Sequence, residues 1–188
     1  HLDRAVVESQ MRRNPECRII APASILDSLD IPHESKIYLS DMERYSTGDC
    51  VITPVPVPHM EYHESSPHHS DFYGYILEYG GMRIFHGGDM VSEPELIERL
   101  REYSSFDYAF LPINGRDSER ESRGIIGNMH PDEAVEFALE IHARTLVPTH
   151  FDMIAGNTGD LQAFRNAAEG RIGYIVPVPG KAIELNPF

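Results

Sequence analysis

Residues 72–89 read FYGYILEYGGMRIFHGGD, and this stretch decides the fold class. Two runs rich in aromatic and branched apolar residues flank Gly80-Gly81, a pair that tolerates the positive φ angles of a type I′ turn. We therefore predict a β-hairpin with strands at 72–79 and 82–85. The second strand leads into His86-Gly87-Gly88-Asp89, which places a carboxylate just past a strand end.

Strands and helices alternate along the rest of the chain. Apolar periodicity and turn-forming residues predict strands at 17–20, 36–39, 50–57, 108–111 and 145–147, and helices at 23–29, 93–101 with Ser92 as its N-cap, 131–141 and 161–168. Three prolines in 51–58 push that strand toward a sheet edge or a strand end. A long polar loop is predicted at 112–129, and a closing hairpin at 172–178 and 181–185. No linker or repeat interrupts the alternation, so residues 1–188 are predicted to form a single α/β domain.

Composition excludes several classes of protein. Hydrophobic residues at 41% and charged residues at 24% are typical of a globular chain. No apolar run approaches the roughly 18 residues of a membrane span, and no secretory signal is evident, so we expect a cytoplasmic protein without membrane partners. Thirty acidic against 16 basic residues give a charge of −14, which repels nucleic acid. Cys17 and Cys50 lack metal-type spacing and are interpreted as reduced thiols.

Histidine and aspartate residues follow three of the predicted strands: His59, Asp89 and His150. A single histidine in such a place is commonly a surface or core residue, and an aspartate after Gly-Gly is often part of a turn. Together, however, imidazole and carboxylate are the ligands of Zn²⁺, Mn²⁺ and Fe²⁺. We expect Asp89 and His150 to lie roughly 3 to 5 Å apart if they bind one ion. Competitors for the role of His59 lie in the same loop: His63, His68 and His69.

Several motifs carry a resemblance to a known family: 84–89 (IFHGGD), 112–117 (PINGRD), 127–129 (GNM), and 148–153 (PTHFDM) with Asn157-Thr158. Together they resemble the metallo-β-lactamase superfamily, and within it the L-ascorbate-6-phosphate lactonase group. The resemblance implies an αβ/βα sandwich with metals at one edge between the sheets. His1-Leu2-Asp3 is similar to the tail of the family's first metal motif, His-x-His-x-Asp-His. We therefore expect the later part of that fold only, without its first strands and most of that motif.

The same resemblance implies the chemistry. Its metal ligands would be His1, His59, Asp89 and His150, with Asp89 and His150 also catalytic, and the complete protein would hold up to two Zn²⁺ or Mn²⁺ ions. A metal-bound hydroxide would hydrolyse a lactone or ester in a small, anionic, phosphorylated sugar-type substrate. Without the first motif, we expect this chain alone to hold one ion at most and to show negligible catalysis.

Arginines in the polar loop could bind an anionic substrate. Arg116 lies beside Asn114, with Asn128 further along, and an arginine fork suits phosphate. Arg116, Asn114 and Asn128 are the predicted substrate-binding residues, ahead of Arg120 and Arg123. The interleaved acidic residues could instead pair with these arginines: Asp117, Glu119 and Glu121. His86 and Asp152 are similar to residues that flank the metals and orient a ligating ring.

Two alternatives remain open. One is a phosphodiesterase or nuclease of the same fold, which the acidic composition disfavours. The other is a non-catalytic, metal-poor fragment or binding module. Absence of the first strands would leave an apolar sheet face and an open edge, so we also expect the chain to form homo-oligomers.

Overall fold

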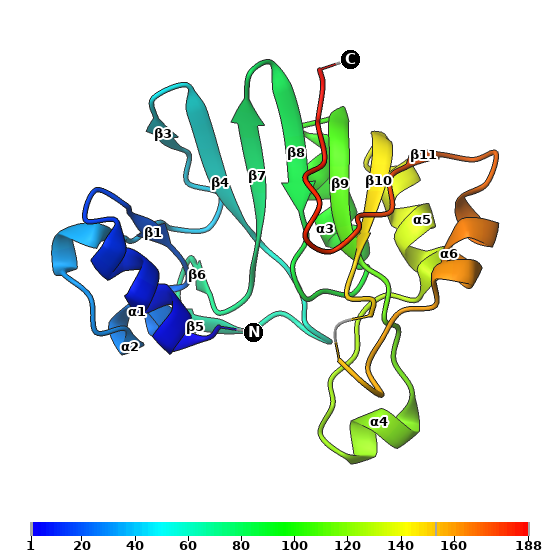
Figure 1. Cartoon of the computed structure of the whole chain (residues 1–188), viewed down its shortest axis with the longest axis horizontal. Helices are drawn as coiled ribbons and strands as arrows, with labels where there is room; N and C mark the ends of the chain where they lie inside the picture. The colour runs from blue at the N-terminus through cyan, green and yellow to red at the C-terminus, as the bar shows by residue number, and fades with distance from the viewer. Residues whose placement is uncertain (1, 153, 188) are drawn as a thin grey trace.

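A seven-stranded mixed sheet forms the centre of the protein in the computed structural model, which describes residues 2–152 and 154–187 apart from the side chain of residue 65 (Figure 1). From one edge to the other its strands are β11 (Gly173–Tyr174), β10 (Ala143–Thr149), β9 (Phe106–Pro112), β8 (Met82–His86), β7 (Tyr73–Tyr79), β4 (Cys50–Pro56) and β3 (Tyr45–Thr47). Strands β8 to β11 run parallel, whereas the pairs from β8 to β3 are antiparallel. Two small sheets lie outside it: β1 (Ile19–Ile20) with β2 (Lys36–Ile37), and β5 (Glu64–Ser66) with β6 (His69–Ser70).

The hairpin predicted from residues 72–85 is confirmed as β7 and β8. Tyr79 pairs with Met82, and Gly80 and Gly81 have φ angles of 59° and 80° between them. A type I′ turn requires positive φ at both central positions, and glycine adopts it without steric cost. The hairpin lies in the interior of the sheet, so β8 connects its antiparallel half to its parallel half.

The prolines of β4 lie beyond the part of the strand that pairs with β3. Strand β3 pairs only with Cys50–Ile52, whereas β7 pairs with the full length of β4. Pro54 and Pro56 therefore lie beyond the end of β3, where a missing N–H does not interrupt the β3–β4 ladder. The prediction of an edge-like position is confirmed for this half of β4.

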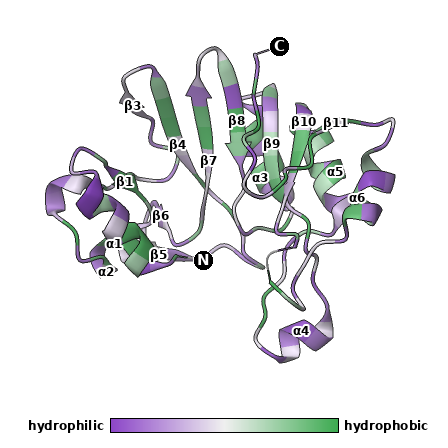
Figure 2. Cartoon of the chain, in the orientation of Figure 1, coloured by the Kyte–Doolittle hydropathy of each residue, from purple (hydrophilic) through white to green (hydrophobic). Residues whose placement is uncertain are grey.

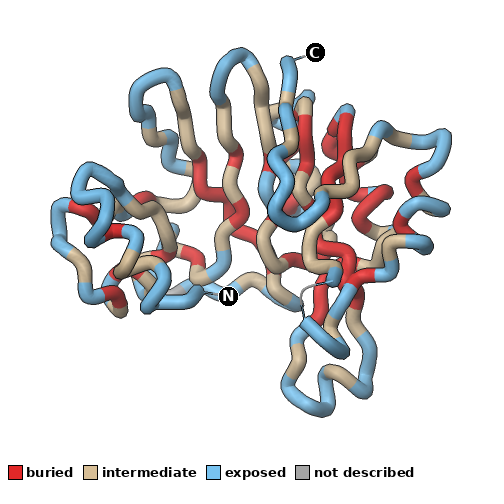
Figure 3. Tube along the Cα trace, in the orientation of Figure 1, coloured by how far each residue is buried: buried red, intermediate tan, exposed pale blue. Residues whose placement is uncertain are grey.

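Helices cover one face of the sheet. Helix α5 (Pro131–Glu140) contacts β9 and β10 and packs against α3 (Pro94–Arg101) and α6 (Leu161–Ala168). The core between these layers contains four phenylalanines that are at most 1% exposed: Phe85, Phe106, Phe137 and Phe164. Figure 3 shows buried residues concentrated in the strands and in the helices behind them. This packed layer is the rigid base from which the strand-end loops project.

The remaining helices are short or peripheral. Helix α1 (Arg4–Arg13) and α2 (Ala23–Ser28) lie beside the small β1–β2 sheet, a single 3₁₀ turn covers His33–Ser35, and α4 (Ser118–Ser122) projects away from the domain (Figure 1). Sequence analysis did not predict α1 or α4. Both begin after an aspartate whose carboxylate accepts a backbone hydrogen bond: Asp3 from Val6 N at 3.1 Å, and Asp117 from Arg120 N at 2.9 Å.

The other face of the sheet is only partly covered. Tyr75 Oη donates to Ile20 O at 3.2 Å, which fixes β1 above β7. A hollow of about 590 Å³ lies between them, and apolar side chains such as Ile52 and Leu77 line it. Figure 2 shows how strongly the hydrophobic residues concentrate in the strands. The sheet thus carries an apolar surface on the side opposite α5.

The predicted closing hairpin at 172–185 is wrong. Only Gly173–Tyr174 forms a strand there, and it runs parallel to β10 instead of pairing with the residues that follow. The tail instead crosses the sheet, where Tyr108 Oη donates to Asn186 O at 3.0 Å and accepts from Asn186 N at 3.1 Å. Ile172, Tyr174 and Val176 pack against the core instead, which accounts for the apolar pattern that predicted a hairpin. Among the helices described, none is long and apolar enough to cross a membrane.

Candidate metal centre

Two of the predicted site residues meet at one edge of the sheet. Asp89 follows β8 and His150 follows β10, and both strands lie parallel to β9 between them. His150 Nδ1 lies 3.1 Å from Asp89 Oδ1, and the side chains are 22% and 19% exposed. The predicted convergence is confirmed. A carboxylate and an imidazole from separate loops thus form one partly buried pair.

Glycines bring Asp89 to this position. Gly87 N donates to Phe110 O at 2.9 Å, which extends the β8–β9 ladder beyond β8. A Cβ atom on Gly87 would lie 2.5 Å from Met90 Sδ, so a larger residue would require Met90 to shift, and Gly88 has a φ of 69°. His86 lies next to them: its Nδ1 accepts from Gly88 N at 3.2 Å, and its ring stacks on Phe110 with centroids 5.7 Å apart.

A closed loop holds His150. His150 has a φ of 60°, a left-handed conformation that is uncommon outside glycine and that occurs at functional sites. Gly159 N donates to His150 O at 3.0 Å, and Asp152 N donates to Thr158 Oγ1 at 2.6 Å. These contacts hold residues 150–152 against residues 158–159. The exposed Asp152 thus contributes to the site through its backbone.

His59 is the histidine of the 59–69 loop that lies near this pair. Val91 N donates to Pro58 O at 2.9 Å, which brings His59 beside the segment that follows Asp89. Burial lowers the pKa of His59 below its usual value, and the charge of Asp89 partly opposes this effect. His59 Nε2 is buried and has no hydrogen-bond partner in the described part of the chain. An imidazole nitrogen without a partner at this place fits a metal ligand.

The competing histidines make other contacts. His63 Nδ1 lies 2.5 Å from Asp71 Oδ2, and His69 Nδ1 lies 3.0 Å from Pro67 O. His68 is exposed and has a φ of 63° in the turn between β5 and β6. These positions favour His59 over the other three as the histidine that faces Asp89. His1, the fourth predicted ligand, lies outside the described residues.

Burial also shapes the protonation of His150. Loss of solvent lowers the pKa of this ring, and the nearby charge of Asp89 raises it by a smaller amount. A lowered pKa favours the neutral ring near neutral pH, and a neutral imidazole has the lone pair that a metal ion requires. Both His59 and His150 are therefore suited to bind a cation.

The two asparagines predicted to bind substrate are buried beside the pair. Asn114 is 5% exposed and Asn128 is 1% exposed. Asn128 Nδ2 lies 2.9 Å from Asp89 Oδ1, 2.9 Å from Asn114 Oδ1 and 3.1 Å from His150 Nδ1. Asn114 Nδ2 in turn donates to Asn157 Oδ1 at 2.9 Å. In this structure the Asn128 amide contacts Asp89 and His150, the Asn114 amide contacts Asn128 and Asn157, and neither faces an open surface.

The arginines of the polar loop are engaged by protein groups. Arg116 donates to Glu133 through Nη1 at 2.6 Å and Nη2 at 2.8 Å, so its fork is occupied by a carboxylate. Arg120 Nη1 donates to Asn114 O at 2.8 Å and to Asn157 Oδ1 at 3.0 Å. The alternative that acidic residues of the loop pair with its arginines is observed for Arg120 with Asp117 and for Arg123 with Glu119. Sequence analysis missed Glu133 and gave no role to Asn157, although the motif Asn157-Thr158 pointed to it.

The pair does not form a complete metal shell. Among the residues that the structure describes, no three His, Cys, Asp or Glu side chains converge closely enough to hold an ion. The residues present nevertheless fit a divalent cation, because they supply imidazole and carboxylate donors and the unpartnered Nε2 of His59.

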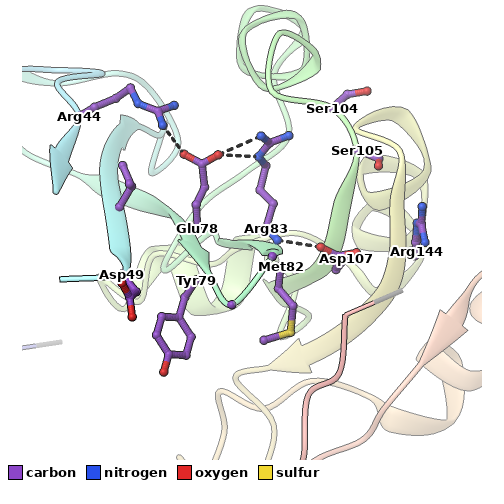
Figure 4. Close-up of a pocket in the computed structure, with 13 residues that line it drawn as sticks. Arg44, Asp49, Glu78, Tyr79, Met82, Arg83, Ser104, Ser105, Asp107 and Arg144 are labelled. Carbon is purple, nitrogen blue, oxygen red and sulfur yellow. Dashed lines mark hydrogen bonds and ion pairs between the residues drawn. The ribbon is translucent and has the colours of Figure 1, made fainter. Parts of the chain in front are cut away.

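A polar hollow of about 570 Å³ lies at the opposite end of the strands, beside the β7–β8 turn (Figure 4). Its charges neutralise one another. Glu78 lies between Arg44 and Arg83, with Oε2 to Arg44 Nη2 at 2.7 Å and Oε1 to Arg83 Nη2 at 2.9 Å. Arg83 N also donates to Asp107 Oδ2 at 2.7 Å. These contacts stabilise the sheet end, so Asp89 and His150 remain the candidate site.

The fold and this site define an α/β protein with an imidazole–carboxylate pair at the ends of parallel strands. A family model described as "Beta-lactamase superfamily domain" matches residues 4–151, and the chain belongs to that family. The solved structure of Igni18, a metallo hydrolase from Ignicoccus hospitalis, superposes with a TM-score of 0.72 at 19% identity, over 95% of this chain and 73% of that one. The metallo-β-lactamase fold protein YhfI from Bacillus subtilis gives 0.63 at 16% identity, over 93% and 68%. The predicted metallo-β-lactamase fold is confirmed.

Curated relatives are similar over a shorter range. A metal-dependent hydrolase from Thermococcus onnurineus is 29% identical over 114 residues, which cover 60% of this chain and 46% of that protein. One from Bacillus velezensis is 31% identical over 114 residues, or 60% of this chain and 44% of that protein. The chain thus spans about half the length of the curated relatives that it matches.

Proposed function

We propose that the chain carries part of the active site of a metal-dependent hydrolase, with Asp89, His150 and His59 as metal ligands. The observation that carries this proposal is the partly buried pair of Asp89 and His150, whose Oδ1 and Nδ1 atoms lie 3.1 Å apart at the ends of parallel strands. The names of the curated relatives support the same activity. His1 stays a predicted fourth ligand.

Each of these residues has a distinct task. His59 and His150 present neutral imidazoles because burial lowers their pKa values, and Asp89 supplies the negative charge that balances a cation. When bound, a divalent ion such as Zn²⁺ or Mn²⁺ would lower the pKa of a water molecule and polarise the attacked carbonyl. The partly buried position of the pair limits the access of bulk water, which strengthens the electrostatic interactions at this site.

For the substrate we propose an ester or lactone with a neutral, partly apolar body. A hollow of about 380 Å³ adjoins Asp89, and its lining includes Pro22, Ile25 and Phe72. The residues described as lining it include the carboxylates of Asp71 and Asp89 and no Lys or Arg. This lining supports a neutral substrate more than the phosphorylated sugar that the lactonase resemblance implies.

The non-catalytic alternative also has an observation in its favour. No three ligand side chains converge in the part of the chain that the structure describes, which suits a metal-poor module. Hydrolysis is therefore proposed for the complete protein, and metal binding for this chain. A phosphodiesterase role has less support, because the net charge of −14 opposes binding of a polyphosphate backbone.

The test compares hydrolysis of a neutral lactone with that of its phosphorylated counterpart by the complete protein supplied with Zn²⁺ or Mn²⁺. We expect faster hydrolysis of the neutral lactone, and loss of activity in Asp89→Asn and His150→Ala. His63→Ala is the matched control and should keep its activity, since His63 pairs with Asp71 instead. Hydrolysis that survives Asp89→Asn and His150→Ala would refute the proposal, and a preference for the phosphorylated lactone would refute the substrate class.

A further inference from the structure

Three buried or half-buried amides connect the polar loop to the candidate metal centre. Arg120 Nη1 donates to Asn157 Oδ1 at 3.0 Å, and Asn114 Nδ2 donates to the same oxygen at 2.9 Å. Asn128 Nδ2 donates to Asn114 Oδ1 at 2.9 Å and to Asp89 Oδ1 at 2.9 Å. We call Asn157, Asn114 and Asn128 the amide relay. It runs from a guanidinium at one end to the Asp89 carboxylate at the other.

The relay is held rigidly by the backbone around it. Asn128 N donates to Gly115 O at 3.1 Å, and Gly115 N donates to Met129 O at 2.9 Å. Met129 N donates to Met90 O at 3.2 Å, which ties this segment to the residue after Asp89. A Cβ on Gly127 would lie 2.3 Å from Gly115 O, so the loop segments that contain Gly115 and Gly127 are in close contact. Asn128 thus has little freedom to move away from Asp89.

The number of hydrogens on Asn128 Nδ2 determines which of its neighbours can accept a hydrogen bond from it. Its Nδ2 has two hydrogens, but three polar atoms of other residues lie within 3.1 Å of it: Asp89 Oδ1, Asn114 Oδ1 and His150 Nδ1. The carboxylate Oδ1 of Asp89 takes the stronger, charge-assisted bond, and Asn114 Oδ1 takes the second. His150 Nδ1 is then the donor to Asp89 Oδ1 at 3.1 Å. This assignment leaves the lone pair of the His150 ring on Nε2.

The reverse orientation of the amide is excluded by its neighbours. If Asn128 were flipped, its oxygen would face the oxygens of both Asp89 and Asn114, and the contacts would become repulsive. In the observed orientation, Asn128 Oδ1 is buried without a hydrogen-bond partner in the described residues. Burial of an unpaired amide oxygen is unfavourable. A side chain that served only to fill space would not need this polar group.

We propose that Asn128 is a positioning residue of the metal centre: through the amide relay it fixes Asp89 and selects the His150 tautomer whose Nε2 accepts a cation. Asn128 is 1% exposed, so it acts through Asp89 and His150 and not by contact with substrate. This role replaces the substrate contact that the sequence predicted for Asn128 and Asn114. The inference rests on the proposed function, because it concerns how the same pair is prepared for a metal ion.

The main experiment measures Zn²⁺ affinity of the whole chain by competition with a coloured chelator. Removal of a group that orients metal ligands typically costs about 10- to 100-fold in affinity, and we expect a loss in this range for Asn128→Ala. Asn114→Ala should cause a smaller loss, because Asn128 keeps its bond to Asp89. Ile141→Val, which trims a fully buried core side chain outside the relay, should bind Zn²⁺ like the wild type.

A second measurement does not depend on bound metal. Nitrogen-15 NMR of the metal-free wild-type chain should show a hydrogen on Nδ1 of His150 and none on Nε2. A hydrogen on Nε2 would overturn the proposal, as would Asn128→Ala binding Zn²⁺ within about twofold of the wild type, or Ile141→Val losing as much affinity as Asn128→Ala. If the wild-type chain binds no Zn²⁺, the metal centre itself fails, and the NMR result alone decides whether the relay sets the tautomer.

Discussion

Glu133 joins the start of α5 to the polar loop, and its removal tests the packing around the candidate site. Its carboxylate accepts two bonds from Arg116, at 2.6 and 2.8 Å, and one from His130 N at 2.8 Å. Arg116 Nη1 also donates to Asn128 O at 3.1 Å, so Glu133 supports the segment that carries the relay. Replacement by alanine therefore removes an ion pair and a helix cap together.

The structure sets the size of the expected loss. The Arg116 and Glu133 side chains are 30% and 34% exposed, so solvent screens the ion pair to about 1 kcal/mol. Loss of the bond to His130 N at the start of the helix adds about 1 kcal/mol. We therefore expect Glu133→Ala to lower the free energy of unfolding by about 2 kcal/mol. Asp132→Ala, the neighbouring exposed carboxylate, should cost at most about 0.5 kcal/mol.

The pH dependence has a definite sign. Hydrogen bonds from Arg116 hold the pKa of Glu133 below its ordinary value of 4.5 in the folded protein. A carboxyl with a lowered pKa stabilises the fold above its unfolded pKa, and this contribution is lost as the pH falls through the folded pKa. The gap in stability between the wild type and Glu133→Ala should therefore be full near neutral pH and narrow in acid.

Urea unfolding is measured for the wild type, for Arg116→Ala, for Glu133→Ala and for the double variant Arg116→Ala/Glu133→Ala. The four values give the loss in free energy of unfolding and the coupling energy between the two residues. We expect a coupling of about 1 kcal/mol between Arg116 and Glu133. A loss below about 0.5 kcal/mol for Glu133→Ala, or additive single effects, would refute the structural role given to this pair.

Two further substitutions test other contacts. Gly127→Ala should lower stability by about 3 kcal/mol, since its Cβ would lie 2.3 Å from Gly115 O, and an unchanged thermal midpoint would contradict this close packing. Asp41→Ala should cost about 2 to 3 kcal/mol in urea unfolding, because Asp41 accepts bonds from Ser70 N at 2.9 Å, Ser70 Oγ at 3.0 Å and Tyr73 Oη at 2.8 Å. A loss in Asp41→Ala no larger than that of the exposed control Asp132→Ala would show that this cluster contributes little.

Local chemistry made the central hairpin predictable, whereas the C-terminal segment was not. The turn at Gly80-Gly81 is specified by positive φ within two residues, so sequence alone places β7 and β8. Residues 172–178 and 181–185 are also largely apolar runs separated by Pro179-Gly180, but the tail is held at Tyr108 of the sheet, which bonds Asn186. Such long-range contacts leave no local signal. Helix α1 was not predicted because its sequence is largely polar, although Asp3 could have been recognised as an N-cap residue.

The site shows a similar division. Placement after strands was enough to predict the convergence of Asp89 and His150, because the ends of parallel strands meet at one sheet edge. The roles of the loop side chains were harder to predict. Asn128 and Arg116 have the chemistry of substrate contacts, and only the folded structure shows that they face Asp89 and Glu133. Burial decides between these roles, and sequence composition of a loop does not specify burial.

Metal content of the chain tests the central claim most directly. Elemental analysis of purified protein after incubation with Zn²⁺ should find one equivalent at most, and this metal should be lost in Asp89→Asn and in His150→Ala while His63→Ala retains it. The contrary result is equally clear. Retention of metal by Asp89→Asn and His150→Ala, or its loss in His63→Ala, would show that the ion binds elsewhere and that the strand-end pair is not a metal centre.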